Sequence, residues 1–125
     1  MFEKTDIHFN NIMSQITTHV LDTSLGLPAE GISIVLEKSV NDEKWDKIAD
    51  GITNKDGRIT ELLPLDTILE PGDYRLVFNT GAYFRKEGVQ GFYPYVYVVF
   101  EIIDENYYHI PLLLSPYGYS TYRGS

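Results

Sequence analysis

Residues 95–114 read YVYVVFEIIDENYYHIPLLL, and large apolar side chains recur there at every second position in two separate runs. The first run has Val96, Val98 and Phe100 at its even positions, and the second has Tyr108 and Ile110. A period of two places these side chains on one face of a β-strand, so the stretch predicts two strands that each bury their even face. The odd positions of both strands are then expected to point away from the core.

The same alternation recurs over most of the chain, which makes the strand its dominant element. It is clear in Ile16–Asp22, Gly31–Lys38 and Tyr74–Asn79, and Lys44–Ile52 is expected to be a further strand whose inward face is unclear. Turn sequences that contain glycine or proline separate the runs at residues 25–28, 71–73 and 115–118. Short strands at this spacing, about seven or eight in all, are typical of a β-sandwich.

Two shorter segments complete the expected architecture. The sequence NKDG at residues 54–57 is a hairpin signal that precedes the short run Arg58–Thr60. The sequence TGAYFRKEGV at Thr80–Val89 predicts a single helix that is capped by Thr80. The expected fold class is therefore all-β with one short helix.

Composition limits the kind of protein. The chain has 125 residues, no cysteine and a formal net charge of −8. This length fits one domain, which we expect over residues 15–125, behind a loosely ordered N-terminal segment at residues 1–14. The lack of cysteine excludes disulfides, thiol catalysis and zinc sites built from cysteine. The negative charge argues against nucleic acid or an anionic membrane as a partner.

The sequence shows no sign of a membrane span or a secretory signal. No stretch approaches the roughly 18 consecutive apolar residues that a membrane-spanning helix needs. The first residues, MFEKTDIHFNNIM, lack a cationic start followed by an apolar core. We therefore expect a cytoplasmic location.

Two of the three histidines occupy equivalent places in their strands. His19 and His109 both lie at odd positions, so their imidazoles are expected to point away from the core, whereas His8 lies in the polar N-terminal segment. Judged from spacing alone, two unrelated surface histidines are the simpler explanation. A zinc site on the pair is a weak alternative, because two ligands without an HExxH-type spacing carry little information. Arg58, by itself, reads as a solvated turn residue.

The odd face of the run that begins at Tyr95 is unusually apolar for a solvated surface. It carries Tyr95, Tyr97 and Val99. Contiguous exposed apolar residues often mark a contact surface, so the outer face of one sheet is expected to be covered by another subunit.

Three stretches resemble signature segments of one family. THVLDTSLGLPAEGI at Thr18–Ile32 resembles the opening motif of the transthyretin-like family, and NKDGRI at Asn54–Ile59 resembles its arginine-bearing turn. YHIPLLLSPYGYSTYRGS at Tyr108–Ser125 is similar to its C-terminal signature, and a final YRGS marks the enzymes of the family. The order and spacing match from about Ile16 onward. The resemblance implies a transthyretin-like (prealbumin-like) β-sandwich of seven to eight strands.

The resemblance also implies one of two functional branches. His19 stands where the thyroid-hormone carriers of the family have a lysine, and the YRGS end is absent from those carriers. The implied branch is 5-hydroxyisourate hydrolase, which converts 5-hydroxyisourate to 2-oxo-4-hydroxy-4-carboxy-5-ureidoimidazoline in urate (purine) degradation. The alternative is a non-catalytic, transthyretin-type small-molecule binding protein on the same scaffold.

The functional residues of the family carry over onto seven positions. The resemblance implies catalytic roles for His19, Arg58, His109 and Ser125, and substrate-binding roles for Tyr122, Arg123 and Gly124. It implies neither a cofactor nor a metal, and it leaves open which histidine is the general base.

The resemblance finally implies an assembly. The family forms a homotetramer, a dimer of dimers, and the outward faces of its first and last strands line a channel between the two dimers. His19 and His109 would then face a subunit interface. One position departs from the pattern, since Tyr107 stands where many members have a histidine, and we expect it to alter local polarity rather than to abolish activity.

Overall fold

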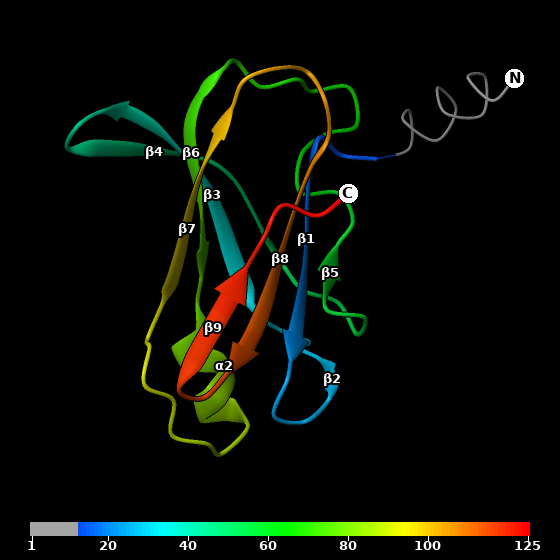
Figure 1. Ribbon diagram of the computed structural model, residues 1–125, viewed down its shortest axis with the longest axis vertical. Helices are drawn as coiled ribbons and strands as arrows, with labels where there is room; N and C mark the ends of the chain where they lie inside the picture. Colours follow the sequence, from blue (N-terminus) through cyan, green and yellow to red (C-terminus); the bar gives the residue numbers. More distant parts are fainter. Residues whose placement is uncertain (1–12) are drawn as a thin grey trace, which may run out of the picture.

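Two β-sheets pack face to face around one hydrophobic core (Figure 1). The computed structural model describes residues 13–125, so residues 1–12 of the predicted N-terminal segment lie outside the described part. The elements in order are β1 (Ile16–Asp22), β2 (Leu27–Pro28), β3 (Ser33–Asn41), β4 (Lys44–Ile52), β5 (Arg58–Ile59), β6 (Gly72–Phe78), α2 (Thr80–Lys86), β7 (Val96–Ile102), β8 (Tyr108–Ser115) and β9 (Gly118–Thr121). The predicted all-β sandwich with one short helix is confirmed for residues 13–125.

Each sheet contributes one inward face to the core. The first sheet has the order β2-β1-β8-β9, and β5 shares with β2 the remaining edge of β1. The second sheet has the order β4-β3-β6-β7. The inward side chains include Ile16, Val20, Ile34, Leu36, Leu76, Phe78, Val96, Ile110 and Leu112, all of them buried. Because the sheets meet through these apolar faces, their opposite faces are left for solvent, ligands or other chains.

Strands β1 and β8 confirm the predicted outward placement of the two histidines. Burial alternates strictly along β1, and Thr17 and His19 are half-buried on the outward face. His109 is half-buried in β8 between the buried Tyr108 and Ile110. The two strands run parallel and side by side in the middle of the first sheet (Figure 1), with Thr17 directly opposite His109. Residues from the two ends of the domain thus share one surface.

The NKDG turn forms, but the predicted hairpin does not. The Gly57 amide donates to the Asn54 carbonyl at 2.9 Å, which closes the turn. Strand β5 then pairs with β1 of the first sheet, although the preceding strand β4 belongs to the second. The Val20 amide donates to the Gly57 carbonyl at 2.8 Å, and at Gly57, with φ of +74°, a β-carbon would overlap the Val20 carbonyl oxygen. The turn therefore carries the chain from one sheet to the other.

The predicted cap of helix α2 was wrong by one residue. Asn79 is the N-cap, and its side-chain oxygen accepts from the Ala82 amide at 3.2 Å. Thr80 is buried, and its hydroxyl instead donates to the Tyr93 carbonyl at 2.9 Å. The helix ends at Lys86, three residues before the predicted end at Val89, and Gly88 with φ of +75° turns the chain away.

The two residues before β1 pack against the domain. Ser14 and Gln15 are buried, and the Ser14 hydroxyl donates to the Ile16 carbonyl at 2.8 Å and accepts from the Leu63 amide at 3.2 Å. Among the described residues, no helix is long and apolar enough to cross a membrane.

Candidate active site

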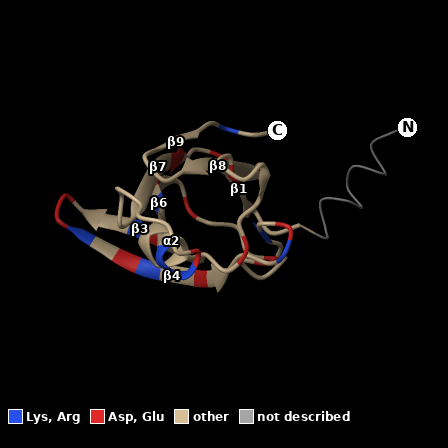
Figure 2. Cartoon of the chain, turned by 90° about the horizontal axis from the view of Figure 1, so that it is seen from below, with Lys and Arg blue, Asp and Glu red and all other residues tan. Residues whose placement is uncertain are grey.

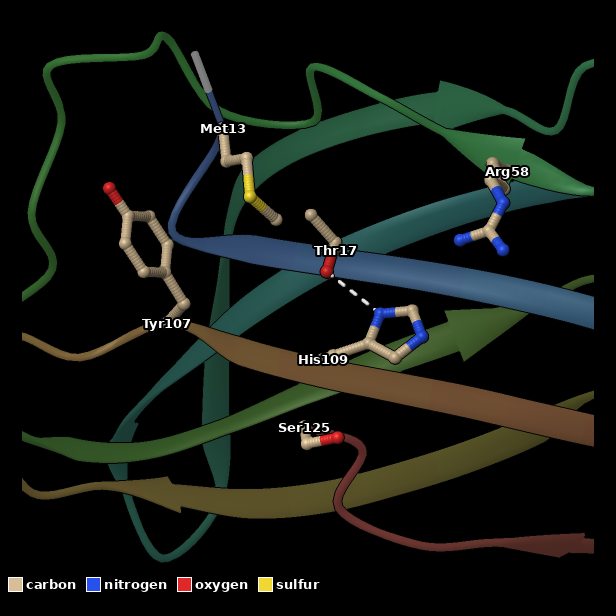
Figure 3. A pocket seen from close by; sticks show the side chains of 6 residues that line it. All are labelled: Met13, Thr17, Arg58, Tyr107, His109 and Ser125. Atoms are coloured by element: carbon tan, nitrogen blue, oxygen red, sulfur yellow. Dashed lines mark hydrogen bonds between the residues drawn. The ribbon is translucent and has the colours of Figure 1, made fainter. Parts of the chain in front are cut away.

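A pocket of about 390 Å³ opens on the outward face of the first sheet (Figure 3). It is lined by Met13, Thr17, Arg58, Tyr107, His109 and Ser125. Arg58, His109 and Ser125 are three of the four positions to which the resemblance gave catalytic roles. They come from β5, from β8 and from the segment after β9, so the fold brings together residues that are far apart in the sequence.

His109 is held by a hydrogen bond from the neighbouring strand. Its Nδ1 lies 2.8 Å from the hydroxyl oxygen of Thr17, its partner in the parallel pairing of β1 and β8. Nε2 points away from Thr17 (Figure 3). One ring nitrogen is therefore engaged by the protein, while the other is available to a bound molecule.

The segment after β9 packs against the His109 ring. The Gly124 amide donates to the His109 carbonyl at 2.8 Å, which forms an isolated antiparallel bridge. A β-carbon on Gly124 would lie 2.5 Å from Cδ2 of the imidazole, so any other residue would displace the ring. Glycine at this position lets the backbone lie against the ring, and this contact brings Ser125 to the pocket.

Arg58 and His19 are neighbours across the first sheet. They lie opposite each other in the pairing of β1 with β5. The Asn54 side-chain oxygen accepts from the Arg58 amide at 3.1 Å, so the NKDG turn fixes the backbone of this residue. His19 is half-buried on the same outward face as Thr17, but it does not line the pocket itself.

Both imidazoles are shifted towards the neutral form. Burial lowers the pKa of His109, and the positive charges of Arg58 and His19 lower it further, while a hydrogen bond with the Thr17 backbone raises it. Burial and Arg58 also lower the pKa of His19, opposed by a backbone hydrogen bond and the charge of Asp56. Each pKa lies below the ordinary value of 6.5. At neutral pH both rings can therefore accept a proton.

Tyr122 and Arg123 lie elsewhere. Both line a groove of about 250 Å³ between β7 and β8, separate from the pocket. The Arg123 guanidinium lies 4.3 Å from the centre of the Tyr108 ring and donates to the Tyr107 carbonyl at 3.4 Å. Within one chain, Arg123 therefore anchors the C-terminal segment to β8.

Three pocket residues were not among the predicted site residues: Met13, Thr17 and Tyr107. The alternation that places His19 and His109 outward also places Thr17 and Tyr107 outward, so the signal was present for those two. No group of three or more His, Asp or Glu side chains in residues 13–125 is arranged to hold a metal ion.

Comparison with known proteins places this site in a family. The HIUase/Transthyretin family model matches residues 16–124. The chain belongs to this family. Among curated members, it is 48% identical over 117 residues to a 5-hydroxyisourate hydrolase of Salmonella dublin, a match that covers 93% of this chain and 82% of the relative.

Solved structures of the HIUase/Transthyretin family have the same fold. The 5-hydroxyisourate hydrolase of Klebsiella pneumoniae superimposes with a TM-score of 0.77 at 36% identity, over 88% of this chain and 98% of that chain. Sea bream transthyretin in complex with thyroxine superimposes with a TM-score of 0.83 at 31% identity, over 89% and 95%. Since both functional types fit the same scaffold, the side chains of the pocket must distinguish them.

Proposed function

We propose that this chain is an enzyme that hydrolyses 5-hydroxyisourate to 2-oxo-4-hydroxy-4-carboxy-5-ureidoimidazoline, a step of urate degradation. The observation that carries the proposal is the pocket itself, where a neutral imidazole, a guanidinium and a hydroxyl converge from three segments. A hydrolase needs a proton acceptor near neutral pH and positive groups where negative charge develops. The named relatives with 5-hydroxyisourate hydrolase activity support the same substrate.

His109 is the group we assign as general base. Its Nε2 takes a proton from water as the water oxygen bonds to a ring carbonyl carbon of the substrate, which places negative charge on the carbonyl oxygen. When this intermediate collapses, the carbon–nitrogen bond of the cyclic amide breaks, and the imidazolium returns the proton to the departing nitrogen. The ring opens to a ureido group and a carboxylic acid, which releases its proton to solvent as a carboxylate, so one water is consumed and no cofactor is needed.

Arg58 supplies the positive charge of the site, and His19 lies beside it. Arg58 presents a planar, permanently charged fork that suits paired oxygens of the substrate. It also lowers the pKa of both histidines, which keeps them neutral and able to act as bases. His19, next to Arg58 across the sheet, is placed to orient the substrate from the side of β1.

The C-terminal segment completes the pocket in this proposal. Ser125 positions water or substrate through its hydroxyl, and Gly124 allows the backbone to reach His109. Tyr122 and Arg123 lie outside the pocket of a single chain, so we propose that they contribute to substrate binding by fixing this segment or from a neighbouring subunit.

We also propose a homotetramer. The outward residues Tyr95, Tyr97 and Val99 are 51%, 49% and 59% exposed in the single chain, which is unusual for apolar side chains on one surface. The pocket, too, opens on an outer face that a second copy could cover. Light scattering tests the assembly, and the expected mass is four times the chain mass of 14.3 kDa. The cytoplasmic location stays a prediction.

The deciding experiment uses freshly prepared 5-hydroxyisourate, which decays spontaneously in water. Added protein should speed the loss of its ultraviolet absorbance in proportion to protein concentration, and EDTA should leave this rate unchanged. A protein that binds small molecules without catalysis, as the likeness to sea bream transthyretin would allow, leaves the decay at its spontaneous rate.

A further inference from the structure

Four threonines surround strand β8, and one of them differs from the rest. Three hydroxyls donate to main-chain carbonyls of β8: Thr18 to Ile110 at 2.7 Å, Thr23 to Leu114 at 3.1 Å and Thr121 to Pro111 at 2.6 Å. The Thr17 hydroxyl has instead a side-chain partner, Nδ1 of His109, at 2.8 Å. The first three hydrogen bonds stabilise the packing of the main chain of β8, whereas the fourth binds an imidazole in the pocket.

We propose that Thr17 is a positioning residue that holds His109 in the Nδ1–H tautomer, so that Nε2 faces the pocket as the unprotonated base. This inference rests on the proposed hydrolysis for its effect on rate, but the tautomer itself can be measured without any substrate. Thr17 has no assigned role in the proposed reaction so far, and it would act only through His109.

The direction of this hydrogen bond follows from the base role proposed for His109. A neutral imidazole has one N–H donor and one bare nitrogen, and the partner of one nitrogen decides the state of the other. Nε2 points away from Thr17 and must be bare to take a proton from water, so the ring hydrogen is placed on Nδ1. There it is donated to the Thr17 hydroxyl oxygen, 2.8 Å away.

The ring is confined from a second direction as well. Gly124 lies against Cδ2, Cγ and Cβ of His109, and the Gly124 amide is bonded to the His109 carbonyl. The hydrogen bond between Thr17 and Nδ1 restricts rotation of the imidazole about its side-chain bonds. A flipped ring would lose that hydrogen bond. The arrangement has the three parts of an oriented base: an orienting group, an imidazole and an open position for water.

The test compares variants that differ in one hydroxyl. Thr17→Val keeps the shape and the β-branched side chain but removes the oxygen, and Thr17→Ser keeps the oxygen. Thr23→Val is the matched control, because it removes a hydroxyl bonded to β8 away from the pocket. Should Thr17→Val fail to fold, Thr17→Ala and Thr17→Ser give the same contrast, since they too differ by one hydroxyl.

Two readouts are expected to change together. Nitrogen-15 chemical shifts should report the Nδ1–H tautomer of His109 in the wild type, and a smaller fraction of it in Thr17→Val. The kcat of this variant should fall about ten- to a hundredfold, the usual effect of losing an orienting contact behind a functional histidine, with KM nearly constant. Thr17→Ser should restore most of the rate, and the Thr23→Val protein should match the wild type.

The acid side of the pH–rate profile provides a third readout. The charged groups that act on His109 are Arg58 from β5 and His19 from β1, and both remain in every variant. A changed apparent pKa in Thr17→Val therefore reports the Thr17 contact, whereas a merely structural defect would lower the rate at every pH alike.

Two results would overturn the proposal. One is a wild-type His109 that carries its hydrogen on Nε2, and the other is a folded Thr17→Val protein whose tautomer and kcat equal those of the wild type. A wild-type protein that does not accelerate the decay of 5-hydroxyisourate would instead refute the proposed function, and the nitrogen-15 shifts would still decide the role of Thr17.

Discussion

The outward faces of the two sheets are built from the same alternating pattern, but they differ in whether their cationic side chains are paired with anionic ones. On the outward face of the second sheet, cations are paired with anions: Arg75 donates to Glu37 at 2.6 Å, and Lys47 pairs with Asp50. Figure 2 shows acidic and basic residues alternating along β4, whereas β8 and β9 are largely uncharged. On the first sheet, Arg58 has no ion-pair partner among residues 13–125, and its nearest functional neighbours are imidazoles.

Charge pairing distinguishes the candidate site from the outward face of the second sheet. A paired cation is largely neutralised and contributes little beyond solubility. An unpaired guanidinium beside half-buried histidines lowers their pKa and leaves its own donors free for a ligand. Perturbed imidazoles in a pocket are typical of catalytic sites, and the second sheet shows no such group in its described residues.

The largest expected effect comes from removing residues 122–125. This deletion takes away Ser125 and the Gly124 contact with His109, but β9 ends at Thr121, so the sandwich should still fold. We expect turnover to fall to the spontaneous rate, with circular dichroism and melting temperature close to those of the full chain. If the segment only supports assembly, light scattering on the same sample would show dissociation, and activity would fall only in proportion.

Single histidine substitutions should come next. His109→Asn and His19→Asn keep polar side chains of similar size, and each should lower kcat/KM by about a hundredfold, the usual effect of losing a positioned acid–base group. Because both side chains point outward, the melting temperature should change little. Equal rates in wild type and variants would show that neither histidine takes part in catalysis.

Arg58→Lys should have a smaller effect that depends on geometry. Lysine keeps the charge but loses the planar fork, so kcat/KM should fall about tenfold if two oxygens of the substrate are bound, the scale of one charge-assisted hydrogen bond. The matched control is Arg75→Lys, on the outward face of the second sheet, which should leave kcat/KM unchanged. An Arg58→Lys protein with full activity would reduce Arg58 to a turn residue.

The smallest effect concerns pH. A base with a lowered pKa stays neutral to lower pH, so kcat/KM should reach its plateau at a lower pH than an ordinary imidazole would give and should fall as the pH drops through the lowered pKa of the histidines. Folding stability should change with the same sign, because the unfolded chain binds protons more readily than these rings do. In Arg58→Gln, one cause of the lowering is removed, and the acid limb should move to higher pH. An unmoved limb would contradict the assigned influence of Arg58.

The sequence could predict the outward histidines because alternation in Ile16–Asp22 and Tyr107–Leu114 is a local property of each strand. It could not predict that β5 pairs with β1, because that pairing depends on the close approach of Gly57 to Val20 across the fold. The Thr17–His109 contact likewise requires the parallel register of two strands about ninety residues apart, and alternation fixes a face but not a register.

In the proposed reaction, the two imidazoles on the outward face of the first sheet carry out hydrolysis. The most direct measurement is the initial rate of 5-hydroxyisourate loss with the wild type and with the His19→Asn/His109→Asn double variant, both verified as folded and of equal oligomeric mass. We predict that the wild type accelerates the decay and that the double variant leaves it at the spontaneous rate. A double variant as fast as the wild type would show that these imidazoles do not catalyse the hydrolysis.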